Sequence, residues 1–201
     1  MSCIIINEMK KEKKGEIRIT GGKWKGKKIF FDLSNDLRPT PDRAKETLFN
    51  WLGQNLSEMQ CLDLFSGTGA LGLEAFSRGA KKVTFVEKNK NYLQKIKNVY
   101  LEITVKGNCD FFCAECLNWV KNNKSKTKYD LIFIDPPFNK NLIHDLLNGI
   151  LEKELLSKNG RIYIEFEKEL DLKIPESLKL KKKKSLGRKS YVLAEITYPF
   201  S

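Results

Sequence analysis

Short apolar runs alternate with helix-like stretches along most of the chain, and this alternation limits the possible folds more than any other feature. Five apolar runs of strand length are separated by four stretches in which apolar residues recur at helical spacing. Strands that alternate with helices form parallel sheets covered by helices on both faces. We therefore predict an α/β fold built on a mostly parallel sheet. The apolar runs are 61–65, 83–86, 108–114, 130–134 and 161–166, and the helical stretches are 70–78, 89–100, 115–123 and 141–156.

Two more strand candidates follow the last helical stretch directly. Residues 177–184 and 190–197 have no helix between them, so they predict an antiparallel hairpin at the edge of a seven-stranded, mostly parallel sheet. A length of 201 residues suits one main core. We divide the chain into a flexible basic tail (1–15), a hairpin and helix extension (16–58) and the sheet domain (59–201).

The extension ahead of the sheet has its own pattern. Residues 16–31 predict two strands joined by a tight turn at Gly21 and Gly22. Thr40 is expected to cap a following helix, with Pro41 at its first position. Apolar residues at helical spacing then place one face of that helix against the core.

The net charge of +12 is concentrated at two places in the chain. Residues 1–30 carry nine basic and three acidic residues, and residues 173–189 carry eight and one, whereas residues 31–172 carry 20 of each. A chain whose central part is neutral and whose two ends are basic is typical of a protein that binds a polyanion. The alternative is a lysine-rich chain whose charged ends are simply solvated.

Composition argues against several functional classes. A single histidine, His144, which we expect at the surface, argues against a Ser-His-Asp triad and a histidine-rich zinc site. Five irregularly spaced cysteines argue against a secreted disulfide scaffold, so we expect free thiols. The apolar run 3–6 is short for a signal peptide, and no run approaches the roughly 20 residues of a membrane helix. We therefore expect a cytoplasmic protein.

A glycine-rich loop follows the first strand of the predicted sheet. Gly67, Gly69 and Gly72 fit the pattern G-x-G-x-x-G, in which the first two glycines let a ligand approach the backbone and the third lets the helix pack on the strand. Glu87 ends the next strand, where its carboxylate can accept hydrogen bonds from two ribose hydroxyls. The glycines alone fit a dinucleotide or S-adenosylmethionine. Asp63 favours the latter, since a carboxylate repels a diphosphate but can take up a methionine amino group.

The fourth sheet strand ends in the tetrapeptide Asp135, Pro136, Pro137 and Phe138. In an open parallel sheet the carboxyl ends of the strands line the ligand crevice, so this tetrapeptide should face the loop at Gly67. The prolines fix the backbone so that the Asp135 carboxylate and the Pro136 carbonyl can accept from one planar amine. Phe138 would then stack on the ring that bears the amine, which typically contributes roughly 1–3 kcal/mol.

These motifs resemble those of class I methyltransferases that act on exocyclic amines. More specifically, residues 18–27 (RITGGKWKGK) and 37–52 (LRPTPDRAKETLFNWL) resemble the bacterial RsmD family, and the likeness extends over about residues 16–197. That family methylates N2 of a guanine in 16S ribosomal RNA of the small subunit. The resemblance implies a Rossmann-like methyltransferase domain over 59–201 with S-adenosylmethionine as the methyl donor, transferring the methyl group by in-line displacement.

The resemblance also implies the site residues. Residues 113–114, Cys-Ala here, lie where such enzymes often have an acidic or amide residue near the adenine. The expected catalytic residues are Asp135, Pro136, Pro137 and Phe138. The expected cofactor contacts are Asp63, Phe65, Ser66, Gly67, Thr68, Gly69, Glu87, Lys88 and Ala114.

The two basic ends then have a partner, because rRNA is a polyanion. We expect a monomer that acts on 16S rRNA or the small subunit, without metal or membrane, and that takes a base flipped out of its stack or already single-stranded. The expected RNA contacts are Arg18, Lys23, Lys25, Lys27, Arg38 and Arg43.

Three other functions fit parts of the sequence. Cys109, Cys113 and Cys116 have a spacing that occurs in radical enzymes with an iron–sulfur cluster, although we expect the first two in a buried strand as plain thiols. A DNA adenine-N6 methyltransferase shares the tetrapeptide at 135–138. A non-catalytic RNA-binding module that keeps a methyltransferase fold is the third alternative.

Overall fold

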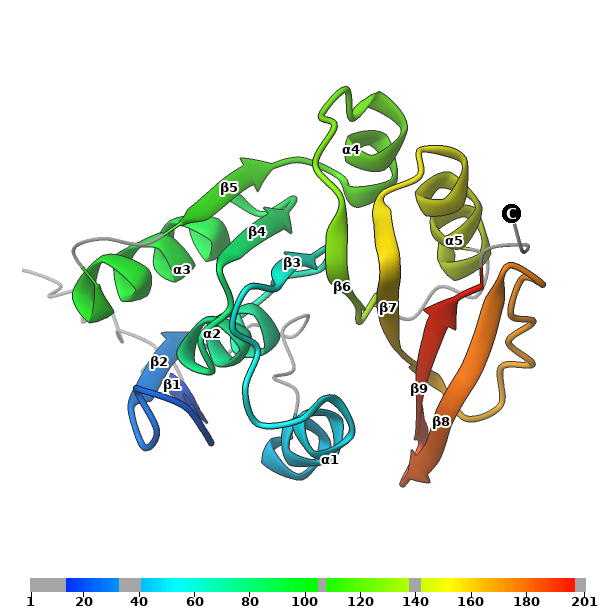
Figure 1. The fold of residues 1–201 in the computed structure, drawn as a ribbon. Helices are drawn as coiled ribbons and strands as arrows, with labels where there is room; N and C mark the ends of the chain where they lie inside the picture. The colour runs from blue at the N-terminus through cyan, green and yellow to red at the C-terminus, as the bar shows by residue number, and fades with distance from the viewer. Residues whose placement is uncertain (1–13, 33–40, 105–107, 138–141, 198–201) are drawn as a thin grey trace, which may run out of the picture.

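A computed structural model describes residues 14–32, 41–104, 108–137 and 142–197. Its main sheet comprises β3 (Gln60–Asp63), β4 (Lys82–Glu87), β5 (Cys109–Cys113), β6 (Tyr129–Ile134), β7 (Leu156–Glu167), β8 (Leu178–Leu186) and β9 (Lys189–Ile196). The spatial order is β5-β4-β3-β6-β7-β9-β8 (Figure 1). The first five strands in this order run parallel, and β9 runs antiparallel to both of its neighbours. The predicted fold, including its antiparallel edge hairpin, is confirmed.

Five helices flank this sheet in the part of the chain that the structure describes. They are α1 (Asp42–Leu52), α2 (Ala70–Ser77), α3 (Lys90–Ile103), α4 (Cys116–Asn122) and α5 (Leu142–Glu152). The helices α1, α2 and α3 share one hydrophobic core, while α4 and α5 belong to a second core. Figure 1 shows α4 and α5 together on one side of the sheet and α1 and α2 on the other.

The central strands are buried on both faces, as a parallel sheet between helix layers requires. Along β6, Leu131 and Phe133 pack in the core of α1 to α3, whereas Ile132 and Ile134 pack in the core of α4 and α5. Successive side chains of a strand point to opposite faces, so one continuous apolar run serves both cores. Each helix among the described residues is too short or too polar to cross a lipid bilayer.

A separate two-stranded sheet precedes α1. Its strands β1 (Lys14–Arg18) and β2 (Lys28–Asp32) pair antiparallel, so the basic hairpin is confirmed, with β1 starting inside the predicted tail. The predicted tight turn at Gly21 and Gly22 is wrong, because the strands are joined by a longer connection. Gly22 has a φ of 77°, and a Cβ there would lie 1.9 Å from the carbonyl oxygen of Ser77 at the end of α2. These glycines therefore let the connection dock on α2.

A buried ionic cluster holds the extension to α2. The fully buried Glu74 carboxylate lies 2.7 Å from Arg78 Nη2 and accepts a 2.8 Å hydrogen bond from the Thr20 backbone N–H. Lys45, on α1, is also buried; its Nζ lies 4.0 Å from Glu74 Oε2 and donates to the backbone carbonyl of Arg18. The Arg78 guanidinium lies 4.5 Å from the centre of the Phe49 ring. Buried charges are tolerated when they are paired in this way.

Three smaller expectations concern single residues. The helix α1 begins at Asp42, with Pro41 as its N-cap, one residue later than predicted, and Thr40 lies outside the described residues. The strand β5 forms the edge of the sheet, so the prediction that Cys109 and Cys113 lie in a buried strand is wrong: Cys113 is exposed. His144, expected at the surface, is half-buried in the first turn of α5.

Candidate active site

Three acidic residues lie at the carboxyl edge of the main sheet. Asp63 ends β3, Glu87 ends β4, and Asp135 directly follows β6. Because Asp63 pairs in register with Phe85 on one side and with Phe133 on the other, these strand ends meet at the same edge. The topology therefore brings the three predicted acidic residues to one edge of the sheet.

The glycine loop closes over the ends of β3 and β4. Gly67 and Gly69 have φ values of 48° and 79°, a region that glycine adopts without strain. The Ser66 hydroxyl lies 2.9 Å from the carbonyl oxygen of Asp63, so this side chain closes the loop. A Cβ at Gly72 would lie 2.3 Å from Cε1 of Phe85, which fits the expected role of the third glycine in helix packing.

Asp63 lies at the floor of the loop. Its side chain is buried and accepts a 3.0 Å hydrogen bond from the backbone N–H of Gly72. Burial raises the pKa of Asp63 to about 7; the Gly72 hydrogen bond opposes this shift, and the charges of Asp135 and Glu87 add to it. The three carboxylates are therefore close enough to interact electrostatically, and a positively charged ligand would reduce their mutual repulsion.

Glu87 is oriented by two backbone N–H groups. Its Oε2 accepts from Gly67 at 2.9 Å, and its Oε1 accepts from Asn89 at 2.8 Å. A carboxylate can accept about four hydrogen bonds, so these two orient the group without using its full capacity. The Ala114 N–H donates to the Glu87 carbonyl at 3.1 Å, and Cys113 Sγ lies 3.7 Å from the Lys88 carbonyl oxygen. Lys88 and Ala114 therefore lie beside Glu87.

The tetrapeptide after β6 is described in part. Asp135 and Pro136 are half-buried, and Pro137 is exposed. Phe138 lies outside the described residues, as does Arg38. Among the cofactor contacts predicted from the loop, Phe65 and Thr68 are half-buried beside Gly67.

A cation from the edge hairpin reaches Asp135, and the sequence had not indicated it. Lys189 Nζ lies 3.0 Å from Asp135 Oδ1 and 3.0 Å from Glu165 Oε2. Glu165 Oε1 in turn accepts a 3.0 Å hydrogen bond from the hydroxyl of Tyr163, which stacks on Tyr191. Lys189 is 54 residues from Asp135 along the chain, and only the antiparallel course of β9 brings it to this edge.

The strand β2 forms a rim beside the glycine loop. Phe30 is 62% exposed there, an unusual position for a large aromatic side chain. A shallow hollow separates this strand from the loop and α3, lined by Ile29, Phe30, Phe31, Gly67, Thr68, Tyr92, Lys95 and Val99. The basic hairpin therefore stands next to the loop at Gly67.

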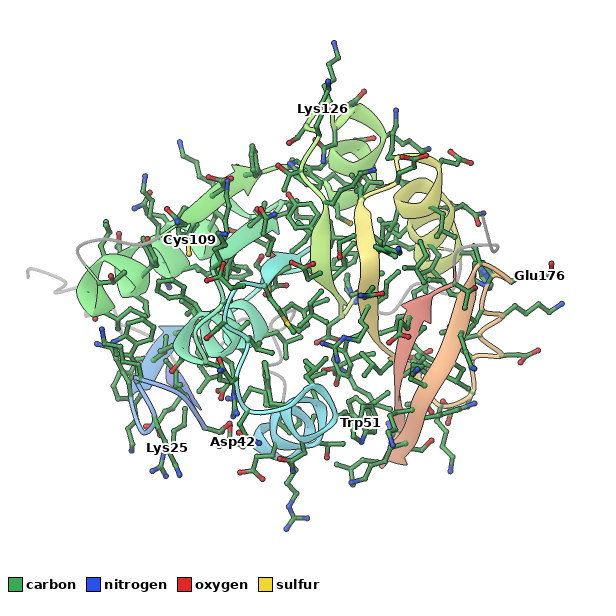
Figure 2. All side chains as sticks on the ribbon, viewed as in Figure 1. Lys25, Asp42, Trp51, Cys109, Lys126 and Glu176 are labelled. Carbon is green, nitrogen blue, oxygen red and sulfur yellow. The ribbon has the colours of Figure 1, made fainter. Side chains whose placement is uncertain are left out.

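The predicted RNA contacts that the structure describes differ in exposure. Arg18, Lys23 and Lys25 are exposed on the hairpin and its connection, and Figure 2 shows Lys25 pointing away from the body. Lys27 is half-buried, with its Nζ 3.3 Å from Glu102 Oε2. Arg43 is exposed on α1.

The second basic segment forms the opposite edge of the main sheet from β5. The strand β8 has β9 as its sheet neighbour, and it carries five exposed lysines. Because β8 runs parallel to β7, the carboxyl end of β8 lies at the same edge of the sheet as Asp135. The exposed lysines are Lys179, Lys181, Lys182, Lys183 and Lys184.

Comparison with known proteins gives a consistent set of relatives. A family model described as "Conserved hypothetical protein 95" matches residues 17–195. The chain is 41% identical over 181 residues to "Ribosomal RNA small subunit methyltransferase D" of Haemophilus influenzae, covering 90% of this chain and 94% of that protein. The Escherichia coli K12 protein of the same name is 38% identical over 182 residues, 89% of each chain. The solved structure of "Putative methyltransferase yhhF" from Escherichia coli matches with a TM-score of 0.80 at 34% identity, covering 90% of this chain and 98% of that one.

Proposed function

Because the chain belongs to the RsmD family, matched by the model "Conserved hypothetical protein 95", we propose that it is an S-adenosylmethionine-dependent methyltransferase of small-subunit ribosomal RNA. Its acceptor is the N2 amine of a guanine in 16S rRNA. The observation that carries the proposal is the meeting of Asp63, Glu87 and Asp135 beside the loop at Gly67. Membership in the family supports the substrate class.

The charge of the crevice fits S-adenosylmethionine. This cofactor carries a positive sulfonium and an amino group, whereas a dinucleotide would bring a diphosphate to the buried Asp63. Asp63 would hold the amino group, and Glu87, which Gly67 and Asn89 orient, would accept hydrogen bonds from the ribose hydroxyls. The bound cofactor supplies a methyl group on a good leaving sulfur, so positioning accounts for much of the rate.

The acceptor amine is held at the end of β6. The Asp135 carboxylate and the Pro136 carbonyl would accept hydrogen bonds from the amine, and the expected role of Phe138, which lies outside the described residues, is to stack on the base. This arrangement turns the nitrogen lone pair away from the ring and toward the methyl group. Asp135 also stabilises the positive charge that develops on nitrogen, a role whose removal typically costs on the order of a hundredfold in rate.

RNA is held by the two basic segments. The hairpin and its connection present Arg18, Lys23, Lys25 and Lys27, and α1 presents Arg43; Arg38, also expected to contact RNA, lies outside the described residues. The lysines of β8 lead to the edge of the sheet where Asp135 lies. Phosphate contacts of this kind fix register and orientation, while the crevice selects the base. A paired target guanine is flipped out of its stack to reach Asp135.

The direct test is methyl transfer with an identified product. Small subunits from cells that lack the enzyme, 16S rRNA and duplex DNA are each incubated with the protein and tritiated S-adenosylmethionine, and the labelled nucleosides are separated. We expect label in N2-methylguanosine from small subunits or 16S rRNA. Label in N6-methyladenosine of DNA would instead identify a DNA adenine methyltransferase. Absence of label, with cofactor binding intact in calorimetry, would indicate a non-catalytic RNA-binding module.

A further inference from the structure

Lys189 bridges two carboxylates at the carboxyl edge of the sheet. Its Nζ lies 3.0 Å from an oxygen of Asp135 and 3.0 Å from an oxygen of Glu165. The Glu165 side chain is fully buried, while those of Asp135 and Lys189 are 17% and 32% exposed. The cation therefore lies at the boundary between the core and the crevice.

Without the Lys189 cation, a charged Glu165 would be buried beside Asp135 with no positive partner. Burial, and then the charge of Asp135, raise the pKa of Glu165 to about 8, whereas Lys189 and the Tyr163 hydroxyl act to lower it. Burial alone would lower the pKa of Lys189, but the charges of Asp135 and Glu165 raise it above its ordinary value. Two neighbouring carboxylates without a cation between them tend to share one proton.

We propose that Lys189 is a positioning residue for methyl transfer: its ammonium group bridges Asp135 to the buried Glu165, supplies the cation that Asp135 faces, and so holds Asp135 as a hydrogen-bond acceptor for the substrate amine. This inference rests on the proposed function, because it concerns the role of Asp135 there. A protonated Asp135 would present a donor to an amine that itself donates, and its stabilising charge would be lost.

Titratable groups on β3, β7 and β9 face this bridge. Asp63 faces Asp135 from β3, Glu165 and Tyr163 face it from β7, and Tyr191 faces the bridge from β9. The tyrosine hydroxyls stay neutral across the working pH range, since burial raises the pKa of both rings above their ordinary value. Among these groups, the carboxylates and Lys189 are therefore the ones that can move the pH profile of the site.

The central test replaces Lys189 by Met and follows kcat against pH at saturating RNA. We expect kcat near neutral pH to fall about tenfold or more, and the acid limb of the profile to move up by about one pH unit or more, because the two carboxylates then share a proton. The double variant Lys189→Met with Glu165→Gln removes the competing charge and should move the acid limb back toward the wild type. Lys189→Arg, which keeps the cation, should retain most of the activity.

A matched control shows whether the effect is specific to Lys189 or follows from removing any half-buried lysine. Lys82 has a side-chain exposure of 33% and lies 2.7 Å from Asp110, at the amino end of β4, so Lys82→Met should leave the pH profile unchanged. Carbon-13 NMR of the carboxyl groups gives a readout without turnover: the titrations of Asp135 and Glu165 should change in Lys189→Met and not in Lys82→Met. If Lys189→Met does not fold, Lys189→Gln removes the charge, keeps a donor and carries the same expectations.

The outcomes distinguish this inference from the proposed function. An unchanged pH profile in Lys189→Met, or no return in the double variant, would overturn the positioning role while Asp135→Ala remains inactive. Near-normal turnover in Asp135→Ala would instead overturn the proposed function itself. A change confined to KM for RNA would also count against the bridge, because it would assign Lys189 to phosphate binding.

Discussion

The Asp63 carboxyl group is buried, so a cationic ligand beside it would stabilise its charged form. Its pKa of about 7 lies above the ordinary 3.8, so between about pH 4 and pH 7 the folded protein without ligand binds more protons than the unfolded chain. The free energy of unfolding therefore falls as the pH rises through this window. A cationic ligand favours the ionised carboxylate, so binding must release a proton where Asp63 is still protonated.

This linkage gives a prediction for cofactor affinity. We expect S-adenosylmethionine to bind more tightly as the pH rises from about 5.5 to about 7.5, with proton release near pH 6.5. Calorimetry in two buffers of different ionisation enthalpy measures both quantities. In Asp63→Asn the affinity should be weaker and independent of pH in this range. A wild-type affinity that does not vary with pH would contradict the assignment of Asp63 to the amino group.

Single residues were predictable where a local pattern carried the signal. Glu87 and Asp135 each end a run of strand residues, so their edge of the sheet follows from the topology. Lys189 and Glu165 were not predictable in this way. Their contact depends on the antiparallel register of β9 on β7, in which Lys189 pairs with Glu167, and a lysine in a basic segment gives no local sign of such a partner.

At the scale of elements, the extension and α2 form one unit through Glu74. Replacing Glu74 by Ala would leave Lys45 and Arg78 buried without this carboxylate, and breaking such a buried pair typically costs about 3–5 kcal/mol. We expect urea unfolding of Glu74→Ala to show a loss of this size. The exposed pair of Glu58 and Lys81 supplies the control, since Glu58→Ala should change the stability little. Equal midpoints for the two variants would contradict a docking role for Glu74.

The lysines of β8 have two physical explanations. Charged residues on an edge strand prevent pairing with other chains, and they also bind phosphates. If they bind RNA, Lys182→Gln with Lys183→Gln should lower the slope of log affinity against log salt by roughly 0.7–0.9 for each phosphate that the variant no longer neutralises. Fluorescence titration with 16S rRNA fragments at several salt concentrations measures the slope.

A charge-matched variant controls for the loss of net charge. Lys124 and Lys126 are exposed before the amino end of β6, and Figure 2 shows Lys126 far from the β8 edge. Lys124→Gln with Lys126→Gln should leave the salt slope unchanged. An equal decrease in both double variants would show that the whole net charge, and not β8, sets the affinity.

The turn at Gly21 and Gly22 shows where element prediction failed. Two adjacent glycines between strand-like runs favour a tight hairpin turn. The structure uses them for close approach to α2 instead, where the Lys23 N–H donates to the Ser77 carbonyl at 2.7 Å. A tertiary contact of this kind leaves no signal in the local sequence.

At the scale of the whole molecule, the fold was predictable because the chain repeats one pattern. Alternating strands and helices fix a parallel sheet, and the closing pair of strands without a helix fixes the antiparallel edge. Local sequence stops being informative where distant segments meet, as at the Lys189 bridge and the Glu74 cluster. The two basic segments flank a body without excess charge, which suits a long polyanion bound across the crevice.

The central claim is that the end of β6 holds the acceptor amine while the loop at Gly67 holds the methyl donor. The Asp135→Ala variant tests the two roles separately, because cofactor binding and methyl transfer can both be measured on it. Asp145→Ala, on the exposed side of α5, is the control. Cofactor affinity is measured by calorimetry, and single-turnover methyl transfer is measured on small subunits. The account predicts cofactor affinity close to the wild type with a transfer rate lower by about a hundredfold or more. Near-normal transfer by Asp135→Ala would contradict it.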